Sequence, residues 1–433
     1  MDARRARRRA AWGAVQAAVL AAAVLAGLGA GRLGQGRQAE ACGPRAGGGQ
    51  VSVHIRPPPE AAHALRRLEA ALRNAGAHVT QAEGGGGAAP DVVWEHAVLF
   101  PGTPDAPCRA LEGHQRYNHI PHNAWLTSKP RLGFLAAERG WTFAPRTLVL
   151  PEDLDDERDA ATPPFAWLAK DPHHRGVVVL EHPPDAGAWR AQLHDGVVFQ
   201  RRVERPWLID GRVCDVGVYA LVDGNAPVRL FDDVLLRCAA APYPDALHRI
   251  DAGEHGSRVS PDVVNRAVVI QEDYHDAGML PSLVGEHGRT RSTLRALRAL
   301  LGAEAQPWAA GVARAIASAL ADARDMGAPG DAVPRAACGW RKALPTVLWP
   351  LAWPCGVQAQ TFEHLRFDFV FDASLHPRIV EVNASPNIKA RNDLQAELLD
   401  RQLRGLVSRA ILRQTDDVRG ADGWFEIDAW KDL

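Results

Sequence analysis

The sequence predicts a mixed α/β (α+β) protein, and three patterns support that fold class. Residues 51–55 (VSVHI), the run 60–76 and residues 91–100 follow one another as strand, helix and strand. From residue 165 onward, Val- and Leu-rich segments alternate with Gly and Pro, which is typical of antiparallel strands and turns. The segment 393–412 carries Leu or Ile every three to five residues, the spacing of an amphipathic helix. These patterns indicate a small parallel sheet followed by a larger α/β unit.

The composition narrows the class of protein. A chain of 433 residues is long enough for two or three domains with a sizeable core. The formal net charge is −1, so the chain lacks the overall basic excess expected of a nucleic-acid-binding protein, and we expect no nucleic acid partner. There is no internal repeat.

The cysteines suggest no zinc site, because no CxxC motif occurs. An even number of six is compatible with disulfides in an oxidising lumen, but the sequence alone does not identify the pairs. The cysteines are Cys42, Cys108, Cys214, Cys238, Cys338 and Cys355.

The N-terminus suggests a membrane anchor. Residues 10–31 carry no charge and follow a basic cluster at Arg4–Arg9, and a bilayer-spanning helix needs about 20 apolar residues. A signal anchor, a cleaved signal peptide, an organelle transit peptide and a soluble Ala-rich helix all fit this run, and the anchor fits best. We therefore expect a single-pass membrane protein whose basic cluster stays cytoplasmic. The side that holds the rest of the chain stays open, because Arg32 and Arg37 lie beyond the apolar run.

The order of segments predicts six parts. They are a basic tail (1–9), a transmembrane signal anchor (10–31), a Gly- and Arg-rich linker (32–50), an N-terminal α/β domain (51–160), a catalytic domain (161–415) and a C-terminal tail (416–433). Inside the catalytic domain we expect strands over 165–180, 196–222 and 227–239, a helix over 292–325, and loops at 239–262 and 326–345.

A predicted hairpin over residues 362–386 carries the most informative side chains. Its midpoint lies in the turn ASLHP, so Asp368 and Glu381 should face each other across the two strands. Asn383 shares the face of Glu381, because side chains alternate along a strand. Two carboxylates and an amide oxygen are hard ligands suited to Mg²⁺ and a nucleotide. The alternatives are an ordinary half-exposed hairpin and, less favoured before Pro386, an N-glycosylation site at Asn383.

A second candidate element could bind the nucleotide's phosphates. Lys170 ends an apolar strand, and Arg175 and Gly176 follow in a short basic loop. A lysine in this position can reach phosphate oxygens, while Gly lets the backbone approach closely. His173 and His174 of the same loop could contact phosphate or metal, but a solvated loop is the favoured interpretation.

The order of these motifs resembles the tubulin–tyrosine ligase-like family. The resemblance rests on WLAKDPHHRGV, FQRRVERPWLIDGRVCDVGVYALV, LLRCA and FEHLRFDFVFD with EVNASPN, together with YNHIPHNAWLTSKPRL at the start of the domain. It covers residues 90–415, and the apolar N-terminus together with DVGVY and VNRAVVIQEDY is most similar to a membrane-anchored subset. The resemblance implies an ATP-grasp ligase fold and the ATP- and Mg²⁺-dependent addition of amino acids to tubulin or other proteins.

The resemblance also assigns site residues. Asp368, Glu381 and Asn383 match the magnesium ligands, and Arg237 matches the arginine that meets the amino-acid substrate. The residues that match the ATP site are Lys170, Arg175, Gly176, Gln200, Arg201, Arg202, Val203, Asp215 and Asn265. Lys170, Arg237 and Asp215 are the expected catalytic residues.

Two positions depart from the family pattern. Val213 and Gly217 stand where the family has a lysine and an arginine beside the γ-phosphate. By analogy with lost oxyanion donors, each missing charge is worth about 3–4 kcal/mol of barrier. Turnover should therefore be slow unless Arg201, Arg202 or Arg212 supplies the charge instead.

The function implied by the resemblance is an ATP-dependent amino-acid ligase of the polyglutamylase type. It would form an acyl phosphate on a protein carboxylate and then an amide with a free amino acid such as glutamate, with the tubulin tail as one candidate acceptor. A catalytically weak nucleotide-binding protein is the first alternative. A lumenal type II glycosyltransferase is the second, with Asp232 and Asp233 as its only metal-motif candidates.

Overall fold

The computed structural model describes most of the chain beyond residue 49. The described ranges are 50–56, 65–81, 90–96, 115–120, 123–150, 153, 163–171, 176–182, 186–194, 196–224, 226–254, 257–270, 275–276, 279–284, 292–326, 361–413 and 422–432. The helix predicted at 10–31 lies outside them. Within them, no helix combines the length and the apolar character needed to cross a bilayer. This finding contradicts the prediction of a single-pass membrane protein with an N-terminal spanning helix.

The first unit is a small parallel sheet with one helix. Its elements are β1 (Ser52–Arg56), α2 (Arg66–Asn74), β2 (His78–Thr80), β3 (Val92–Glu95) and β4 (Arg116–Tyr117), with strand order β2-β1-β3-β4. Leu68 and Leu72 lie one turn apart on α2 and are both fully buried. The chain leaves the helix at Gly76, where φ is +84°. The strand-helix-strand order expected from the sequence is present, and β2 and β4 extend it.

The second unit is a small antiparallel sheet. It contains β5 (Thr147–Leu148), β6 (Trp167–Lys170), β7 (Val177–Leu180), α5 (Ala186–His194) and β8 (Val198–Arg201), in the strand order β5-β8-β6-β7. Trp167 and Phe199 pack with Trp189 of α5, whose ring stacks on Phe199 at 4.2 Å between centroids. This aromatic cluster fixes the sheet and leaves Lys170 at the end of β6.

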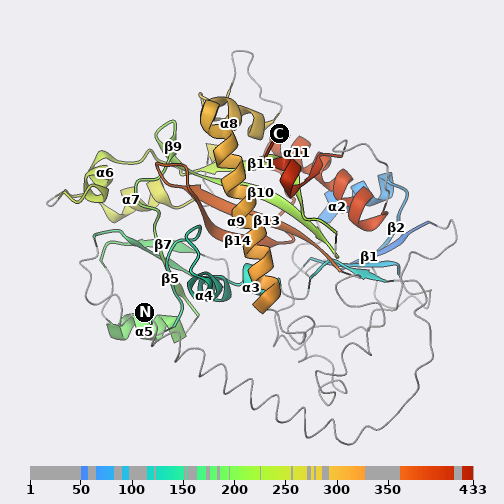
Figure 1. Ribbon diagram of the computed structural model, residues 1–433, viewed down its shortest axis with the longest axis horizontal. Coiled ribbons are helices and arrows are strands. Elements are labelled where there is room, and N and C mark those ends of the chain that lie inside the picture. The colour runs from blue at the N-terminus through green and yellow to red at the C-terminus, as the bar shows by residue number, and fades with distance from the viewer. Residues whose placement is uncertain are drawn as a thin grey trace, which may run out of the picture.

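A larger sheet forms the centre of the described molecule (Figure 1). Its strands are β9 (Leu208–Ile209), β10 (Arg212–Asp223), β11 (Arg229–Cys238), β12 (His275–Asp276), β13 (Phe362–Phe371), β14 (Pro377–Ala384) and β15 (Trp424–Glu426). The main order is β12-β11-β10-β13-β14, while β15 pairs with β11 and β9 with β10. All these pairs are antiparallel.

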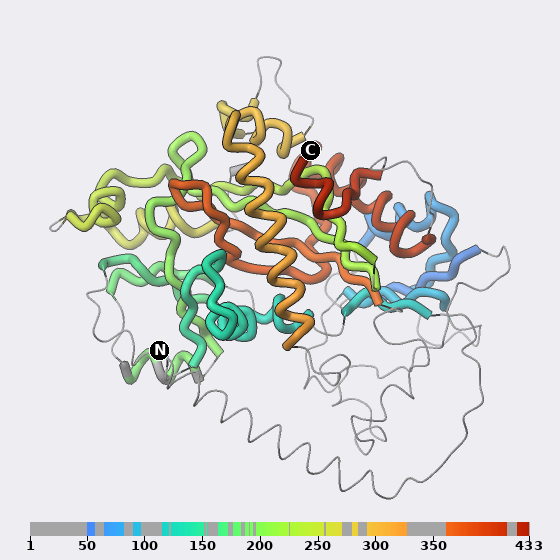
Figure 2. The backbone as a smooth tube through the Cα atoms, in the orientation of Figure 1, coloured from blue at the N-terminus to red at the C-terminus, as the bar shows by residue number. Residues whose placement is uncertain are grey.

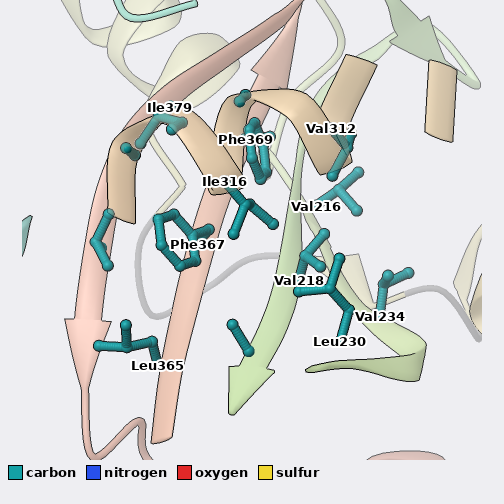
Figure 3. Packing of buried hydrophobic residues seen from close by; sticks show 14 of the residues in the cluster. Val216, Val218, Leu230, Val234, Val312, Ile316, Leu365, Phe367, Phe369 and Ile379 are labelled. Carbon is teal, nitrogen blue, oxygen red and sulfur yellow. The ribbon is translucent and has the colours of Figure 1, made fainter. Parts of the chain in front are cut away.

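Side-chain alternation gives the central sheet two different faces. On one face, Val216 and Val218 of β10 and Phe367 and Phe369 of β13 pack beneath α9 (Ala305–Met326), as Figure 3 shows. Figure 2 shows α9 running across the central strands. The opposite face packs at one end against α2 and α11 (Asp393–Leu406), which continues into a π-helical turn, Val407–Ile411. The other end of that face carries polar side chains.

The remaining helices are short. They are α3 (Ala124–Thr127), α4 (Lys129–Arg139), α6 (Asp245–Asp251), α7 (Pro261–Val268), α8 (Thr293–Leu301), the 3₁₀ turn η4 (Gly302–Glu304) and α12 (Ile427–Trp430). The helix predicted over 292–325 is α8 and α9, with a break at Gly302, where φ is +55°. The loop predicted at 239–262 is wrong in part, because it contains α6 and the start of α7. Leu247 and Ile250 anchor α6 by burial, which its short polar sequence does not reveal. Nearly all of the loop predicted at 326–345 lies outside the described residues.

Candidate active site

The hairpin of β13 and β14 places the expected metal ligands together. Asp368 pairs directly with Glu381 in the strand register, and Asn383 Nδ2 donates a hydrogen bond of 2.9 Å to Asp368 Oδ2. The register then shifts, so that Phe369 pairs with Ile379 and Val380 is the additional residue of a β-bulge. The bulge turns Ile379 toward the core beneath α9 while Glu381 stays on the polar face.

This polar face borders a cavity of about 810 Å³. The cavity lies between the end of the small antiparallel sheet, the polar face of the central sheet and the start of α11. Its lining residues include Lys129, Lys170, Gly176, Val177, Tyr219, Leu235, Arg237, Ile270, Arg366, Glu381, Asn383, Asn387, Lys389, Arg391, Gln395, Leu398 and Leu399. Six of these side chains carry a positive charge and one, Glu381, a negative charge, so the cavity suits an anionic ligand.

Four charged side chains form a connected group on the central sheet, and two of them, Arg237 and Arg366, line the cavity. Arg237 of β11 donates two hydrogen bonds to Asp215 of β10, at 2.9 and 2.6 Å, and a third to Asp368 at 3.1 Å. Arg366 of β13 binds both oxygens of Asp368, at 2.7 and 2.8 Å. Burial raises the pKa of Asp215 to about 6, and the Arg237 guanidinium opposes that rise. Burial alone would lower the pKa of Arg366, but the Asp368 carboxylate reverses the sign and raises it.

Two lysines from outside the central sheet lie beside this group of four charged side chains. Lys170 is only 8% exposed, and its Nζ donates to the carbonyl oxygen of Val380 at 3.1 Å. Burial lowers the pKa of Lys170 to about 8, an effect that nearby Glu381 opposes. Lys129, the first residue of α4, lies 3.3 Å from Glu381 Oε1. Lys129 was not among the site residues predicted from the sequence, although it lies inside the YNHIPHNAWLTSKPRL segment.

The expected magnesium ligands suit the metal in donor type, but Asp368 is already engaged. Glu381 and Asn383 line the cavity with hard oxygens. Asp368 is 1% exposed, and both of its oxygens accept hydrogen bonds from guanidinium groups. The residues therefore fit Mg²⁺ if Asp368 gives up one of these donors when the metal binds.

Of the residues that the resemblance assigns to the ATP site, Gln200 lies beside a narrow slot next to the cavity. Gln200 lines this slot together with Lys170 and Ile379. Its Nε2 donates to Thr147 at 3.3 Å, while its buried Oε1 has no hydrogen-bond partner among the described residues. A buried acceptor without a partner is costly, which favours a ligand with an N–H group at this point.

The arginines proposed to replace the missing family charges are held elsewhere. Arg201 pairs with Glu204 at 2.8 Å, and Arg202 pairs with Asp251 at 2.5 Å. Arg212 donates to the backbone oxygens of Ala239 and Ala240. None of the three lines the large cavity. The suggestion that one of them supplies charge there is therefore not supported by their contacts.

Other expected residues are more scattered. Val203 lines a separate, arginine-rich cavity of about 410 Å³ with Arg201 and Arg202. Asn265 accepts a hydrogen bond from the Val179 backbone N–H at 3.3 Å and does not line the large cavity. Gly176 does line it, whereas Arg175, His173 and His174 lie outside the described residues.

Asp232 and Asp233, the candidates for a glycosyltransferase metal motif, have structural contacts. Both accept hydrogen bonds from Arg401, and Asp233 also accepts the backbone N–H of Leu294 in the first turn of α8. Asp233 is 2% exposed. These contacts join β11 to α8 and α11 and leave little of Asp233 open to a metal.

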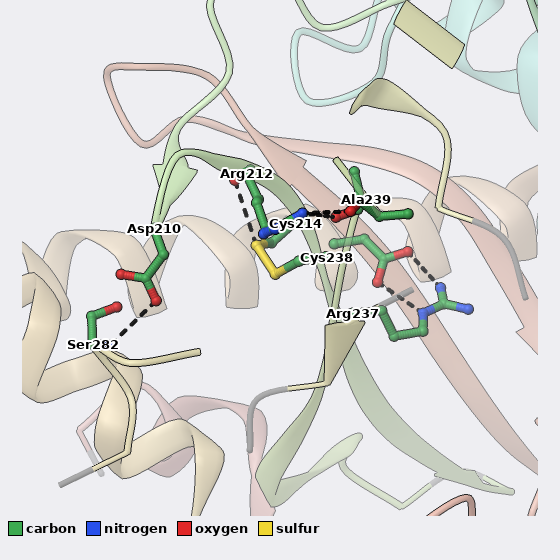
Figure 4. Close-up of a disulfide and its surroundings, with 9 residues drawn as sticks. Asp210, Arg212, Cys214, Arg237, Cys238, Ala239 and Ser282 are labelled. Carbon is green, nitrogen blue, oxygen red and sulfur yellow. Dashed lines mark hydrogen bonds and ion pairs between the residues drawn. A yellow bond between two sulfur atoms is a disulfide. The ribbon is translucent and has the colours of Figure 1, made fainter. Parts of the chain in front are cut away.

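The structure contains one disulfide among its described residues, between Cys214 and Cys238. The two cysteines face each other across β10 and β11, immediately before Asp215 and after Arg237 (Figure 4). The sequence could not identify this pair, because the register of the two strands determines it. The other four cysteines lie outside the described residues.

Comparisons with known proteins find similarity over much of the chain. Residues 108–254 and 356–417 match the tubulin-tyrosine ligase family. A probable tubulin polyglutamylase of Caenorhabditis elegans is 24% identical over 320 residues, which is 72% of this chain and 55% of that protein. A tubulin polyglutamylase of Mus musculus is 24% identical over 326 residues, covering 71% of this chain and 36% of the relative. A tubulin monoglutamylase of Mus musculus is 28% identical over 167 residues, covering 36% and 13% respectively. The chain thus spans about half or less of the length of these curated relatives.

Proposed function

We propose that the chain is an ATP-dependent ligase that joins an amino acid to a carboxylate of a protein, because residues 108–254 and 356–417 match the tubulin-tyrosine ligase family. The observation that carries this proposal is the large cavity between two sheets. There, basic side chains from α4, β6, β11 and β13 surround the oxygen donors of β14. A triphosphate and a carboxylate substrate are both anions, and a cavity of this charge suits both.

For the substrates we propose glutamate as the donated amino acid and an acidic protein tail, such as that of tubulin, as the acceptor. The relatives named above include polyglutamylases and a monoglutamylase of tubulin. Lys389 and Arg391 extend the positive lining toward the start of α11. This end of the cavity would attract an acidic peptide.

The proposed reaction has two steps. The γ-phosphoryl group of ATP passes to the acceptor carboxylate, which gives an acyl phosphate and ADP. The amine of the amino acid then attacks the acyl carbon, and phosphate leaves as the amide forms. Catalysis here consists of positioning and charge neutralisation, so no nucleophilic side chain of the protein is required.

The residues can be given separate roles. Lys170 would bind phosphate oxygens, and Lys129, which lies 3.3 Å from Glu381 Oε1, would assist. Arg237, held by Asp215, would orient the carboxylate of the substrate amino acid. Glu381, Asn383 and Asp368 would hold Mg²⁺, which neutralises phosphate charge when bound.

A protein that binds nucleotide with little turnover is the second candidate. Val213 is 4% exposed and packs in an apolar cluster, and Gly217 has no side chain, so neither supplies the charge expected beside the γ-phosphate. The contacts of Asp232 and Asp233 with Arg401 argue against the glycosyltransferase alternative.

The test is a ligation assay with the full chain, ATP, Mg²⁺, isotope-labelled glutamate and tubulin, read by mass spectrometry and by ADP release. A Lys170→Met variant and tubulin without its C-terminal tails are the controls. ATP-dependent labelling of the tails that Lys170→Met abolishes is the expected result. Tight ATP binding without ADP release across acidic acceptors would favour the second candidate. A protein that binds no ATP would exclude both.

A further inference from the structure

Gly217 and Arg366 occupy one space between two neighbouring strands. Gly217 of β10 pairs with Asp368 of β13, and Arg366 lies two residues before Asp368 on the same polar face. A Cβ atom added to Gly217 would lie 2.9 Å from Cδ of Arg366 and 3.1 Å from Oδ1 of Asp368. Real Cβ atoms almost never approach a heavy atom below 3.0 Å. The Arg366 side chain therefore fills the space that a side chain on residue 217 would need.

Arg366 is held rigidly at the cavity wall. Its side chain is 8% exposed, and its Nε and Nη2 atoms bind the two oxygens of Asp368 in a bidentate pair. The residue still lines the cavity, close to Arg237 and Asn383. A guanidinium has a second terminal nitrogen, Nη1, which these two bonds to Asp368 do not use, and the guanidinium also donates a hydrogen bond to the hydroxyl of Tyr219, which lines the same cavity.

We propose that Arg366 supplies, from β13, the positive charge beside the transferring phosphate that no side chain supplies from residue 217 of β10. This inference rests on the proposed function. Its ligand is a phosphate oxygen of the nucleotide or of the acyl phosphate. The Arg366 side chain also explains why Gly is present at 217, because the space between the two strands cannot hold a second side chain from residue 217.

A purely structural role is the competing explanation. Asp368 is almost fully buried, and a buried carboxylate needs a partner. On this explanation, Arg366 is the counter-ion of Asp368 and has no further role. The two roles predict different results when the guanidinium is supplied from residue 217 of β10 instead of residue 366 of β13. A ligand-binding role follows the position of the charge, so the exchange Gly217→Arg with Arg366→Gly should preserve nucleotide binding.

The experiment compares Arg366→Gln, Gly217→Arg and the double exchange for ATP affinity, melting temperature and ADP-coupled ligation. Arg401→Gln is the matched control, because Arg401 also pairs with a buried aspartate, Asp233, but lies away from the cavity. We expect Arg366→Gln to weaken ATP binding at least 10-fold and to lower kcat about 100- to 1,000-fold, the range for losing one charge-stabilising donor. Gly217→Arg alone should lower the melting temperature. The double exchange should recover ATP affinity to within about 3-fold, and Arg401→Gln should lower only the melting temperature.

The outcomes separate this inference from the proposed function. If the unmodified protein binds ATP and Arg366→Gln binds it equally well, the inference is wrong and the proposed function stands. If Arg366→Gln does not fold, the double exchange decides: a folded protein that has lost ATP affinity refutes the inference. If the unmodified protein binds no ATP, the proposed function itself fails.

Discussion

Nucleotide binding should draw a proton onto Lys170. The ammonium is buried between β6 and β14, where its described hydrogen-bond acceptor is the backbone oxygen of Val380. Burial lowers its pKa from 10.5 to about 8, while Glu381, Asp368 and Asp215 oppose the shift and Lys129 adds to it. A fall of this size corresponds to about 3 kcal/mol against the charged form. A triphosphate beside Nζ would cancel this cost and return the pKa toward its ordinary value.

The sign and the size of the effect follow from these values. Without nucleotide, the folded protein has the lower pKa and the unfolded chain binds more protons between pH 8 and 10.5, so stability should rise with pH across that window. With nucleotide bound, Lys170 should stay charged. The complex should therefore take up about 0.1 proton at pH 7, about 0.5 at pH 8 and about 0.9 at pH 9.

Calorimetric titration of ATP in buffers of different ionisation enthalpy measures this uptake. The slope of the binding enthalpy against buffer enthalpy gives the number of protons at each pH. Lys170→Met should remove the pH dependence, and Lys389→Met is a matched control because that lysine is exposed. Proton uptake that is absent at pH 9, or unchanged in Lys170→Met, would refute the assigned position of the phosphates.

Three further predictions concern the metal site, one buried ion pair and the disulfide. Glu381→Gln should weaken Mg²⁺-dependent ATP binding at least 10-fold at an unchanged melting temperature, and equal affinity in a titration would argue against the metal site. Arg202→Met should cost about 3–5 kcal/mol in chemical unfolding, because it removes the charged partner of Asp251 from a pair with side chains 4% and 1% exposed and leaves only the neutral donors Tyr243 and the Arg205 backbone N–H. The Arg202 pair helps to lower the pKa of Asp251 against the effect of burial, so this stabilisation should disappear as the pH falls through the folded pKa; a stability that stays flat below pH 4 would contradict it. Replacing Cys214 and Cys238, which lie 24 residues apart, by Ala should lower stability by about 3.5 kcal/mol on the chain-entropy model. An equal unfolding midpoint with and without reductant would show that the disulfide contributes nothing.

Local patterns were sufficient to predict the hairpin and its facing residues. Alternation along RFDFVFD (366–372) and the position of the turn predict that Asp368 faces Glu381, and the structure confirms that register. The long amphipathic helix near the C-terminus was also predictable from its Leu spacing, since α11 buries Leu398, Leu399 and Leu403. Both predictions depend only on residues that are close in sequence.

The features that the sequence did not reveal depend on contacts between distant segments. The bulge at Val380 shifts the strand register by one residue, and the alternation of side chains does not predict it. Arg366 lies above Gly217 only because β10 pairs with β13, about 150 residues later in the chain. The pairing of Cys214 with Cys238 follows from the register of β10 and β11. Short helices such as α6 form through burial of one or two side chains, which carries no periodic signal.

Because the central sheet has one apolar and one polar face, residues on one face can be substituted without affecting the other face. Val216, Val218 and Phe367 pack in the apolar layer beneath α9, whereas Asp215 and Asp368, neighbours of Val216 and Phe367 in the chain, bind the arginines Arg237 and Arg366 that line the cavity. Volume-conserving substitutions among the first group alter packing without moving charge, so they are open to neutral drift. A lineage could therefore replace much of its apolar layer while its ligand chemistry stays fixed, or move a charge between neighbouring positions such as 217 and 366 while its core stays intact. Sequence identity across such a lineage would then underestimate how much of the chemistry its members share.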